Sequence, residues 1–440
     1  MNSTETQHVV IIGGSISGLL AARVLSDTFK TVTIVERDAV SPQASERKGV
    51  PQSPQPHILL VKGYRILQSL FPNIEVDLRA AGAVPIDWGT DFRYFSFGGW
   101  SANSSEATEL FSFSCTRPLL ENVIRQQVAK IENVKTLSPY RVTGLIEKDN
   151  QITGVQCHHR HDNLEQKEIQ ANLVVDASGR SSNASNWLES VGQEVPTIDV
   201  VNAGLGYATR RYRLSDDWNA SWKVILVAHK APENTKLGYL AQVENNEFIA
   251  TLGGYERQYP PLEQNAFLDF AQQLPATEFY NAIAHLTPTS DIKAYRSTAN
   301  KLHRYDQLTQ MPAGFIAIGD AVCALCPAYG QGLTTSAMSA LVLKDWLSKQ
   351  PLSNTLTFQK QLAKKVKPAF DIAAGSDSGF ISTKGRLPKS RVGRVMGGYM
   401  QRLIKKSHTD SDLNLRLAKV SHMVASPLNV FHPKVWMKLT

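Results

Sequence analysis

The segment His8-Val-Val-Ile-Ile-Gly-Gly-Ser-Ile-Ser-Gly18 decides the fold. Its apolar run is typical of a buried strand, and the glycine-rich turn leads into residues 19–26, whose apolar side chains recur at helical spacing. A second apolar run, Thr31–Val35, ends at Glu36. Strand, glycine turn, helix and strand in this order predict the opening βαβ unit of a nucleotide-binding sheet.

A turn of this kind is suited to hold the phosphates of a dinucleotide. Gly13 permits the sharp turn, Gly18 lets the helix approach the strand, and the unpaired amides at the helix N-terminus suit a pyrophosphate. Ser15 replaces the middle glycine of the usual fingerprint, and its hydroxyl could donate to a phosphate. Glu36 ends the second strand, where a carboxylate can bind ribose hydroxyls. The alternative is a glycine turn that binds no ligand.

Two later segments add polar groups at strand ends. In Val174-Val-Asp-Ala-Ser-Gly-Arg180, an apolar strand stops at Asp176 and turns at Gly179. In the segment 314–334, Asp320 ends another strand and can bond a sugar alcohol, and a helix begins near Gly332. The positive end of that helix suits negative charge on a bound cofactor. A plain β-turn and an ordinary helix cap are the respective alternatives.

These motifs in order, with Arg117 in Cys-Thr-Arg-Pro-Leu-Leu-Glu, resemble the FAD-dependent group A flavin monooxygenases, which are aromatic-hydroxylase-like proteins with the p-hydroxybenzoate hydroxylase fold. The resemblance covers most of the chain. Within that superfamily, the segment 47–52 with His57, the segment 373–377 and the tail at 426–433 are similar to the branch that contains the polyene epoxidases of polyether biosynthesis.

The resemblance implies that FAD is the cofactor and that NADPH or NADH is the reductant. It places Glu36 at the FAD ribose, Arg117 along the cofactor, and Asp320 at the ribityl or pyrophosphate region. The residues expected to bind the cofactor are Gly13, Gly14, Ser15, Ser17, Gly18, Glu36, Arg37, Arg47, Arg117, Asp176, Gly179, Gly319, Asp320, Gly330, Gly332, Leu333 and Thr334. The residues expected in the catalytic, flavin-facing loop are Pro327, Gly330 and Gln331, with no acid or base assigned.

Two departures from the family pattern affect the reductant and one histidine. The segment 182–186 lacks the arginine that normally follows Gly179, so docking of the nicotinamide by that route is an open question. Gln55 stands where relatives often carry a histidine, which leaves the role of His57 undefined.

The expected fold class is α/β, with a discontinuous Rossmann-like FAD-binding domain from residues 1–85, 112–190 and 290–350. A substrate domain with an antiparallel sheet is expected from 86–111 and 191–289, followed by a helical C-terminal region at 351–440. One set of aromatic residues is equally compatible with lining an apolar substrate cavity and with core packing: Tyr94, Phe95, Phe97, Trp100, Phe111 and Phe113.

Composition excludes several classes of function. The net charge of +8 comes from scattered Lys and Arg residues, with no aromatic-studded basic element, so nucleic acid is not an expected partner. Four cysteines and the absence of a secretory pattern favour the cytoplasm. No apolar stretch is long enough to span a bilayer, although the basic segment 384–406 leaves peripheral membrane contact open. A monomer and a homodimer are both compatible with the sequence.

Metal chemistry is not expected. The pair Cys323-x-x-Cys326 lies within the flavin loop without a second cysteine pair, and His158-His-Arg-His161 is typical of an exposed hairpin, because consecutive strand residues point to opposite faces.

The expected reaction is monooxygenation. NAD(P)H reduces FAD, O2 forms a flavin C4a-hydroperoxide, and one oxygen atom epoxidises or hydroxylates a largely apolar, unsaturated or aromatic molecule of secondary metabolism. The alternatives are an FAD-dependent reductase or dehydrogenase acting on a double bond, and a flavin-binding protein without turnover. The Trp-x-Trp-x-Ile-Pro signature of flavin halogenases is absent.

Overall fold

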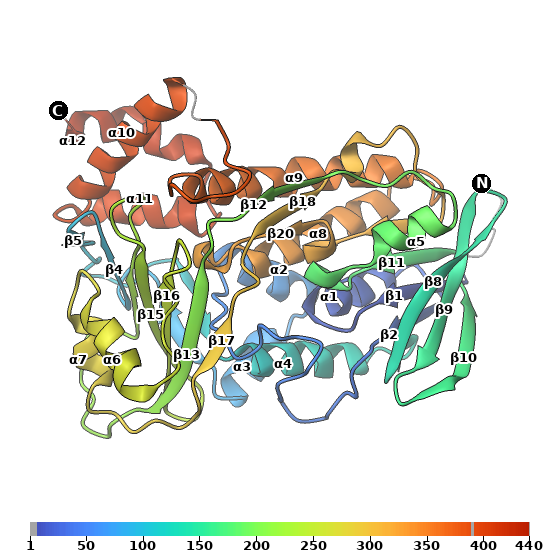
Figure 1. The fold of residues 1–440 in the computed structure, drawn as a ribbon, viewed down its shortest axis with the longest axis horizontal. Helices are drawn as coiled ribbons and strands as arrows, with labels where there is room; N and C mark the ends of the chain where they lie inside the picture. Colours follow the sequence, from blue (N-terminus) through green and yellow to red (C-terminus); the bar gives the residue numbers. More distant parts are fainter. Residues whose placement is uncertain (1–6, 389–390, 440) are drawn as a thin grey trace.

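A computed structural model describes residues 7–388 and 391–439, and it contains the α/β fold expected from the sequence (Figure 1). Its first layer is a five-stranded, wholly parallel sheet. In spatial order the strands are β19 (Phe315–Ala317), β11 (Leu173–Asp176), β1 (His8–Ile12), β2 (Thr31–Val35) and β7 (Val134–Leu137). The strands expected from the opening segment and from residues 172–176 and 314–320 therefore lie side by side, with their carboxyl ends at one edge.

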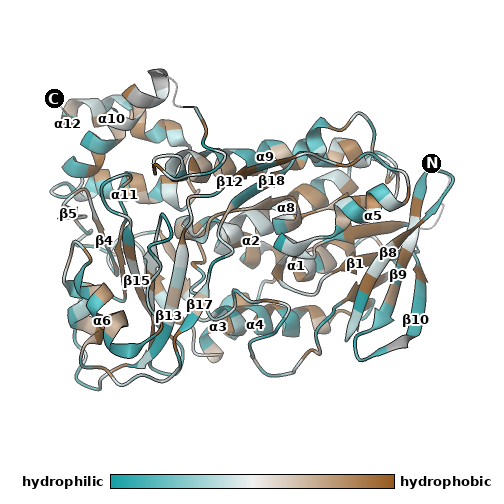
Figure 2. Cartoon of the chain, viewed as in Figure 1, coloured by the Kyte–Doolittle hydropathy of each residue, from teal (hydrophilic) through white to brown (hydrophobic). Residues whose placement is uncertain are grey.

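Helices pack around this sheet because each one buries an apolar face against it or against a neighbouring helix. They are α1 (Ile16–Leu25), α2 (Val61–Leu70), α3 (Ile74–Ala80), α4 (Arg117–Ala129), α5 (Ala184–Ser190), α8 (Gly332–Leu347) and α9 (Thr355–Asp377). The shared core contains Val10 of β1, Leu20 of α1 and Trp346 of α8, all fully buried. Figure 2 shows β1 as hydrophobic along its length and β10 (Asp162–Gln170), at the edge of the molecule, as largely hydrophilic.

Small sheets and short helical turns complete this part of the chain. The antiparallel strands β8 (Tyr140–Lys148), β9 (Gln151–His159) and β10 form one sheet; β12 (Ile198–Val201), β18 (Asn300–His303) and β20 (Cys323–Ala324) form another; β3 (Val84–Asp87) pairs with β6 (Phe111–Ser114). The 3-10 turns are η1 (Gly179–Ser181), η2 (Tyr305–Gln307), η3 (Gly319–Ala321), η4 (Pro327–Tyr329) and η5 (Pro427–Phe431).

A seven-stranded sheet forms the second layer, at the left of Figure 1. Its order is β17 (Lys293–Tyr295), β13 (Gly206–Arg213), β16 (Glu247–Gly254), β15 (Lys236–Val243), β14 (Val224–Val227), β4 (Phe92–Ser96) and β5 (Gly99–Trp100). The helices α6 (Gln264–Gln272) and α7 (Glu278–Ile283) bury Phe267 and Phe279 against it.

The sheet is antiparallel as expected except at one pair, because β14 and β4 run parallel. These two strands are far apart in the sequence, so no hairpin turn forces them to be antiparallel. The sheet also takes β17 from the range 290–350 that we assigned to the other domain. The domain ranges themselves stay a prediction.

The C-terminal region divides into two parts. Helix α9 packs into the main core through Phe358 and Phe370, whereas α10 (Arg391–Lys406), α11 (Ser411–Ser421) and α12 (Pro433–Leu439) form a small cluster of their own. On α10, Leu403 is 1% exposed and Val395 is 76% exposed, so one side of this basic helix packs on its own protein. Among the described residues, no helix is both long and apolar enough to cross a bilayer.

Gly18 provides a test of how closely α1 packs on the glycine turn. A Cβ added there would lie 1.9 Å from the carbonyl oxygen of Gly13, so backbone must shift. We expect Gly18→Ala to lower the free energy of unfolding by about 1–3 kcal/mol, measured by urea denaturation. The control is Gly397→Ala on α10, where an added Cβ meets nothing within 4 Å. Its expected effect is a gain of up to about 1 kcal/mol from helix propensity. Equal effects of the two substitutions would contradict the close packing.

Candidate cofactor and substrate site

Two adjoining cavities lie at the carboxyl edge of the parallel sheet. The larger has a volume of about 510 Å³ and the smaller about 270 Å³. The two cavities share six of their lining residues, which are Ser15, Gly49, Val50, Ala177, Ser178 and Ser181. The cavities are therefore two ends of one trough, placed where open α/β sheets bind their ligands.

The glycine turn forms the floor between the two ends. Gly13 has a φ of +100°, and a Cβ there would lie 2.8 Å from the carbonyl oxygen of Ala177. The amide of Gly14 donates to Oε2 of Glu36 at 2.8 Å. Helix α1 begins after Ser15 without a side-chain cap and without an acidic residue in its first turn. Its positive end is therefore open to an anion in the trough.

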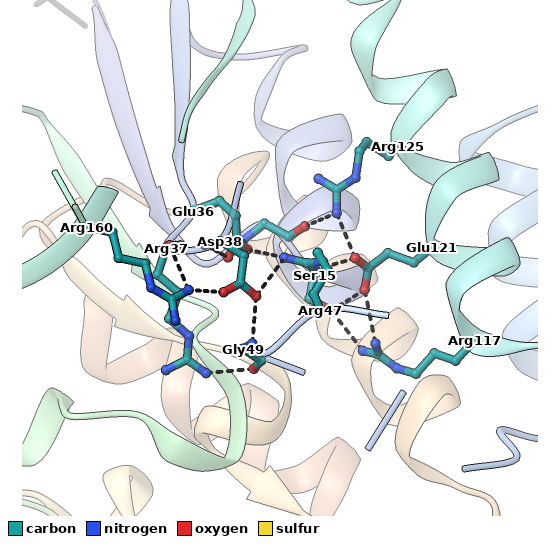
Figure 3. Close-up of polar contacts among 11 residues, drawn as sticks. Ser15, Glu36, Arg37, Asp38, Arg47, Gly49, Arg117, Glu121, Arg125 and Arg160 are labelled. Carbon is teal, nitrogen blue, oxygen red and sulfur yellow. Dashed lines mark hydrogen bonds and ion pairs between the residues drawn. The ribbon is translucent and has the colours of Figure 1, made fainter. Parts of the chain in front are cut away.

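A buried carboxylate surrounded by guanidinium groups borders this turn (Figure 3). Glu121 of α4 accepts hydrogen bonds from Ser15 Oγ at 2.7 Å, Arg117 Nη1 at 3.1 Å and Arg125 Nη2 at 2.7 Å. Arg47 Nη2 also donates to it. Burial raises the pKa of Glu121, but the charges of the arginines outweigh burial and hold the pKa below its ordinary value. Glu121 is therefore ionised at neutral pH.

The same cluster fixes the segment around Gly49. Arg47 Nη1 lies 3.0 Å from Glu36 Oε2 and 3.7 Å from Asp38 Oδ2. Asp38 accepts from the amide of Gly49 at 2.7 Å, as drawn in Figure 3. Because Gly49 and Val50 line both cavities, these contacts shape the wall of the trough.

The cluster has donors to spare. Three arginines meet the single carboxylate of Glu121, and Nη1 of Arg125 is buried without a hydrogen-bond partner among the described residues. Arg117 also donates to Ser15 Oγ at 2.8 Å, beside the open end of α1. Unused buried donors next to a helix N-terminus are what an anionic phosphate group would satisfy.

The far end of the larger cavity contains Asp320 and the N-terminus of helix α8. Asp320, in the turn after β19, faces Arg117 and Arg180; burial raises its pKa, and the two guanidiniums act against that rise. Helix α8 begins after Gln331 without a side-chain cap or an acidic residue in its first turn. A Cβ added to Gly332 would meet nothing within 4 Å, so the backbone here borders open space.

The wall opposite the parallel sheet comes from the seven-stranded sheet and is largely apolar. Its residues include Tyr207, Leu226, Leu237, Tyr239 and Tyr295. None of the six aromatic residues considered from the sequence lines this cavity, and four of them pack in hydrophobic cores instead: Phe95, Trp100, Phe111 and Phe113. Phe95 packs on Trp100 with ring centroids 5.2 Å apart, and Phe111 and Phe113 pack on Tyr64.

A buried polar network lies behind the loop expected to face the flavin. Asp377, at the end of α9, accepts from Tyr329 Oη at 2.6 Å and from Asn300 Nδ2 at 2.8 Å. Asn300 in turn accepts from the amide of Cys326 at 2.7 Å. Pro327, Ala328 and Gly330 line the cavity on the other side of this loop. The network therefore fixes the loop from behind and leaves its cavity face apolar.

The structure gathers most of the predicted site residues along the trough. Those that line it are Gly13, Ser15, Ser17, Glu36, Arg37, Arg117, Gly179, Asp320, Pro327, Gly330, Gly332 and Leu333. Gly14, Gly18, Arg47, Gly319, Gln331 and Thr334 lie behind the wall instead. There they pack or hold other residues: Thr334, for example, is fully buried against Gly63 of α2.

Asp176 differs most from expectation. It is fully buried, and its carboxylate accepts from the amide of Ser178 at 2.9 Å and from the hydroxyls of Ser178 and Ser182. It lines neither cavity and holds the turn after β11, while its contact with a cofactor stays a prediction. The serines that follow a strand-ending aspartate were the missed signal.

Other residues in and beside the trough were missed from the sequence. Glu121 and Arg125 line neither cavity, but they recur at four-residue spacing with the expected Arg117, which places the three on one face of α4 and could have identified the cluster. Arg180 lines the larger cavity and donates to the carbonyls of Ala299 and Leu325. Residues of the opposite wall carried no local signal, because their position depends on the pairing of distant strands.

The cysteine and histidine motifs do not form a metal site within the described chain. Cys323 and Cys326 are free and buried, and burial raises the pKa of both thiols. His158 lies near the end of β9 and lines the smaller cavity, whereas His161 lies in the turn between β9 and β10. Among the described residues, no group of three His, Cys, Asp or Glu side chains could hold a metal ion.

Comparisons with known proteins identify both a relative and the fold. No protein-family model matches the chain. Protein Rv3254 of Mycobacterium tuberculosis is 30% identical over 417 residues, covering 92% of this chain and 86% of that protein. The flavin-dependent brominase Bmp2 superimposes with a TM-score of 0.68 at 12% identity, over 94% of this chain and 93% of that one. The protein pqsL, a probable FAD-dependent monooxygenase from Pseudomonas aeruginosa, gives a TM-score of 0.60 at 16% identity, over 92% and 98%.

Glu121→Gln tests the arginine cluster. Removing the charge leaves the guanidiniums buried with too little negative charge, so we expect a loss of about 3–5 kcal/mol in the free energy of unfolding. The control is Asp371→Asn, which breaks an exposed pair with Lys367 on α9 and should cost less than about 1 kcal/mol. Urea denaturation of both variants at low salt measures the difference. A loss at Glu121 no larger than at Asp371 would show that the cluster does not depend on it.

Asp377→Asn tests the network behind the loop. Burial raises the pKa of Asp377 from 3.8 to about 6 in the folded protein. Between pH 3.8 and about 6, Asp377 binds a proton in the folded protein but not in the unfolded chain. The contribution of this proton to the free energy of unfolding therefore grows as the pH falls through 6 and is lost as the pH rises. Asparagine does not titrate. The stability of wild type relative to the variant should therefore increase on acidification, by up to about 1.4 kcal/mol per pH unit. A difference that stays constant with pH would contradict the raised pKa.

Proposed function

Because the chain belongs to the same family as Protein Rv3254 and has the fold of the group A flavin monooxygenases, we propose that it is an FAD-dependent monooxygenase. In this proposal it uses NAD(P)H and O2 to epoxidise or hydroxylate a largely apolar small molecule. The observation that carries the proposal is the single trough, which has a glycine turn, the open N-terminus of α1 and Arg117 at its centre and an apolar wall at one end.

The residues present fit FAD along the whole trough. Glu36 would hold the ribose in the smaller cavity, and the open end of α1 with Arg117 would hold the pyrophosphate. Asp320 would bond the ribityl chain, and the loop at Pro327–Tyr329 with the N-terminus of α8 would border the isoalloxazine. FAD bound there supplies electron transfer from the nicotinamide and the activation of O2.

The protein itself must position the substrate and exclude water. Ile58, Leu226 and Leu237 offer apolar surface to the larger cavity, where an apolar substrate would share the space with the flavin. Removing water strengthens the electrostatic contacts inside the site and protects reactive species from hydrolysis. Tyr329, which could bring a polar hydroxyl to this wall, directs it to Asp377 instead.

The wall offers little acid–base chemistry near neutral pH, which favours epoxidation of an alkene over hydroxylation of a phenol. Burial lowers the pKa of His57 to about 3 and raises the pKa of Tyr207 and Tyr295. A phenol would benefit from a base that increases the electron density of its ring, whereas an alkene needs no such group.

Asp320→Ala should weaken FAD binding, because it removes a charge-assisted hydrogen bond to the ribityl or pyrophosphate region. We expect an increase in Kd of roughly ten- to hundredfold, equivalent to about 1.5–3 kcal/mol, measured by fluorescence titration of FAD into apoprotein. The exposed Asp371→Ala on α9 serves as the control and should leave the Kd unchanged. An Asp320 variant that purifies with a full complement of FAD would show that this loop is wrongly assigned.

The visible spectrum of the purified protein tests the activity. Under anaerobic conditions, NADPH or NADH should bleach the flavin bands, and air should restore them with consumption of O2. Reduction of an added double bond without oxygen would instead identify a reductase. If neither nicotinamide bleaches the flavin, the protein either depends on a separate reductase partner or binds flavin without turnover. Reducing the flavin chemically with dithionite and then admitting air would distinguish these two cases. A protein that cannot be loaded with FAD would refute the proposal.

A further inference from the structure

His57 lines the larger cavity and has one ring nitrogen fixed by the backbone. Its Nδ1 lies 2.8 Å from the carbonyl oxygen of Gln55. A carbonyl oxygen can only accept a hydrogen bond, so Nδ1 must carry the hydrogen. In a neutral imidazole the other nitrogen, Nε2, then carries a lone pair and can only accept. The backbone of Gln55 therefore decides the hydrogen-bonding character of the ring.

The carbonyl that orients His57 is itself held in place. Gln55 is 3% exposed, and its side chain accepts from Thr209 Oγ1 at 2.5 Å and donates to the carbonyl of Lys293 at 3.2 Å. Thr209 of β13 is joined to Thr251 of β16 at 2.6 Å. The segment before His57 is thus attached to the central strands of the seven-stranded sheet. This attachment leaves little freedom for the ring to turn.

The surroundings keep the ring neutral. Burial and the positive charge of Arg117 lower the pKa of His57 to about 3, against weaker opposing effects of the Gln55 carbonyl and Glu121. At physiological pH the imidazole therefore carries no charge. Among the described residues Nε2 has no hydrogen-bond partner, and the neighbouring wall residues Ile58, Leu226 and Leu237 are apolar.

We infer that Nε2 of His57 is a fixed hydrogen-bond acceptor in the cavity, and that the substrate is an apolar molecule bearing a hydroxyl or N–H group that donates to it. This inference rests on the proposed function for the identity of the cavity. A site built to bond a donor rejects analogues without one, because its own polar group is then left unpaired. His57 would thus determine which apolar molecules are bound productively.

The flavin also carries an N–H group, so the donor could come from the cofactor rather than the substrate. The two sources predict different losses when the acceptor is removed. If the substrate is the donor, His57→Phe should leave the Kd for FAD within about twofold and impair only ligand discrimination. A large rise in the Kd for FAD together with unchanged ligand discrimination would overturn the assignment to substrate.

Ligand discrimination can be measured with geraniol and geranyl methyl ether, an unsaturated pair that differs in one donor. Binding to the oxidised, FAD-loaded protein, without nicotinamide, is followed by the flavin spectrum and by calorimetry. Wild type should bind geraniol about five- to tenfold more tightly than the ether. His57→Phe should bind both equally, His57→Gln should retain part of the preference through its amide oxygen, and the exposed His285→Phe should behave as wild type. Equal binding of the pair by wild type, or no binding of geraniol at millimolar concentration, overturns the inference.

The tautomer can be tested without any ligand. Nitrogen-15 NMR of histidine-labelled protein, with the His57 signals identified by their loss in His57→Phe, should show hydrogen on Nδ1 and a lone pair on Nε2 at pH 7. Hydrogen on Nε2, or on both nitrogens, overturns the inference. Recording the spectrum before and after addition of FAD separates this result from the proposed function: failure to bind FAD would refute the enzyme activity, while the tautomer is read from the protein itself.

Discussion

The carboxylate of Glu121 lies where three segments of the chain meet, and the shape of the trough depends on it. It joins helix α4 to Ser15 of the glycine turn and to Arg47 of the segment that lines both cavities. A buried carboxylate and buried guanidiniums each lose hydration, and only their mutual contacts offset this cost. The cluster therefore depends on every one of its members. When it is complete, it holds the three segments in register. When one partner is missing, the remaining charges are buried without compensation.

The same constraint would prepare the proposed phosphate site in the folded protein before any anion binds. Arginines lining an empty trough would repel one another, and their side chains would be free to move. Glu121 holds Arg117 and Arg125 in place through one nitrogen of each guanidinium, and in the part of the chain that the structure describes Nη1 of Arg125 has no hydrogen-bond partner. A phosphate then meets donors that are already oriented, so less side-chain entropy is lost on binding. The open N-terminus of α1 adds a backbone contribution to the same point.

The local sequence predicted the parts of the fold that local patterns determine. Residues 8–36 form β1, α1 and β2 because apolar periodicity and a glycine turn are encoded within a few residues. The parallel pairing of β4 with β14 could not be predicted, because it joins strands from distant parts of the chain. The same limit applies to the site: Asp320 at a strand end was identifiable, whereas Tyr207 and Leu237 face the cavity through the geometry of the sheet. The role of Asp176 in its own turn was not identifiable, because a strand-ending carboxylate suits a cofactor and a serine-rich turn equally well.

Polar contacts at and behind the wall of the larger cavity hold its segments together. Gln55, which lines the cavity, attaches the His57 segment to the seven-stranded sheet, and Asp377, behind the wall, attaches the loop at Tyr329 to α9. The apolar wall residues Leu226 and Ile58 take no part in either contact. Substitutions at the wall can therefore change the shape of the cavity without breaking the contacts that position the loop. The wall can thus vary in sequence without loss of the fold, which proteins only 12% and 16% identical to this chain share.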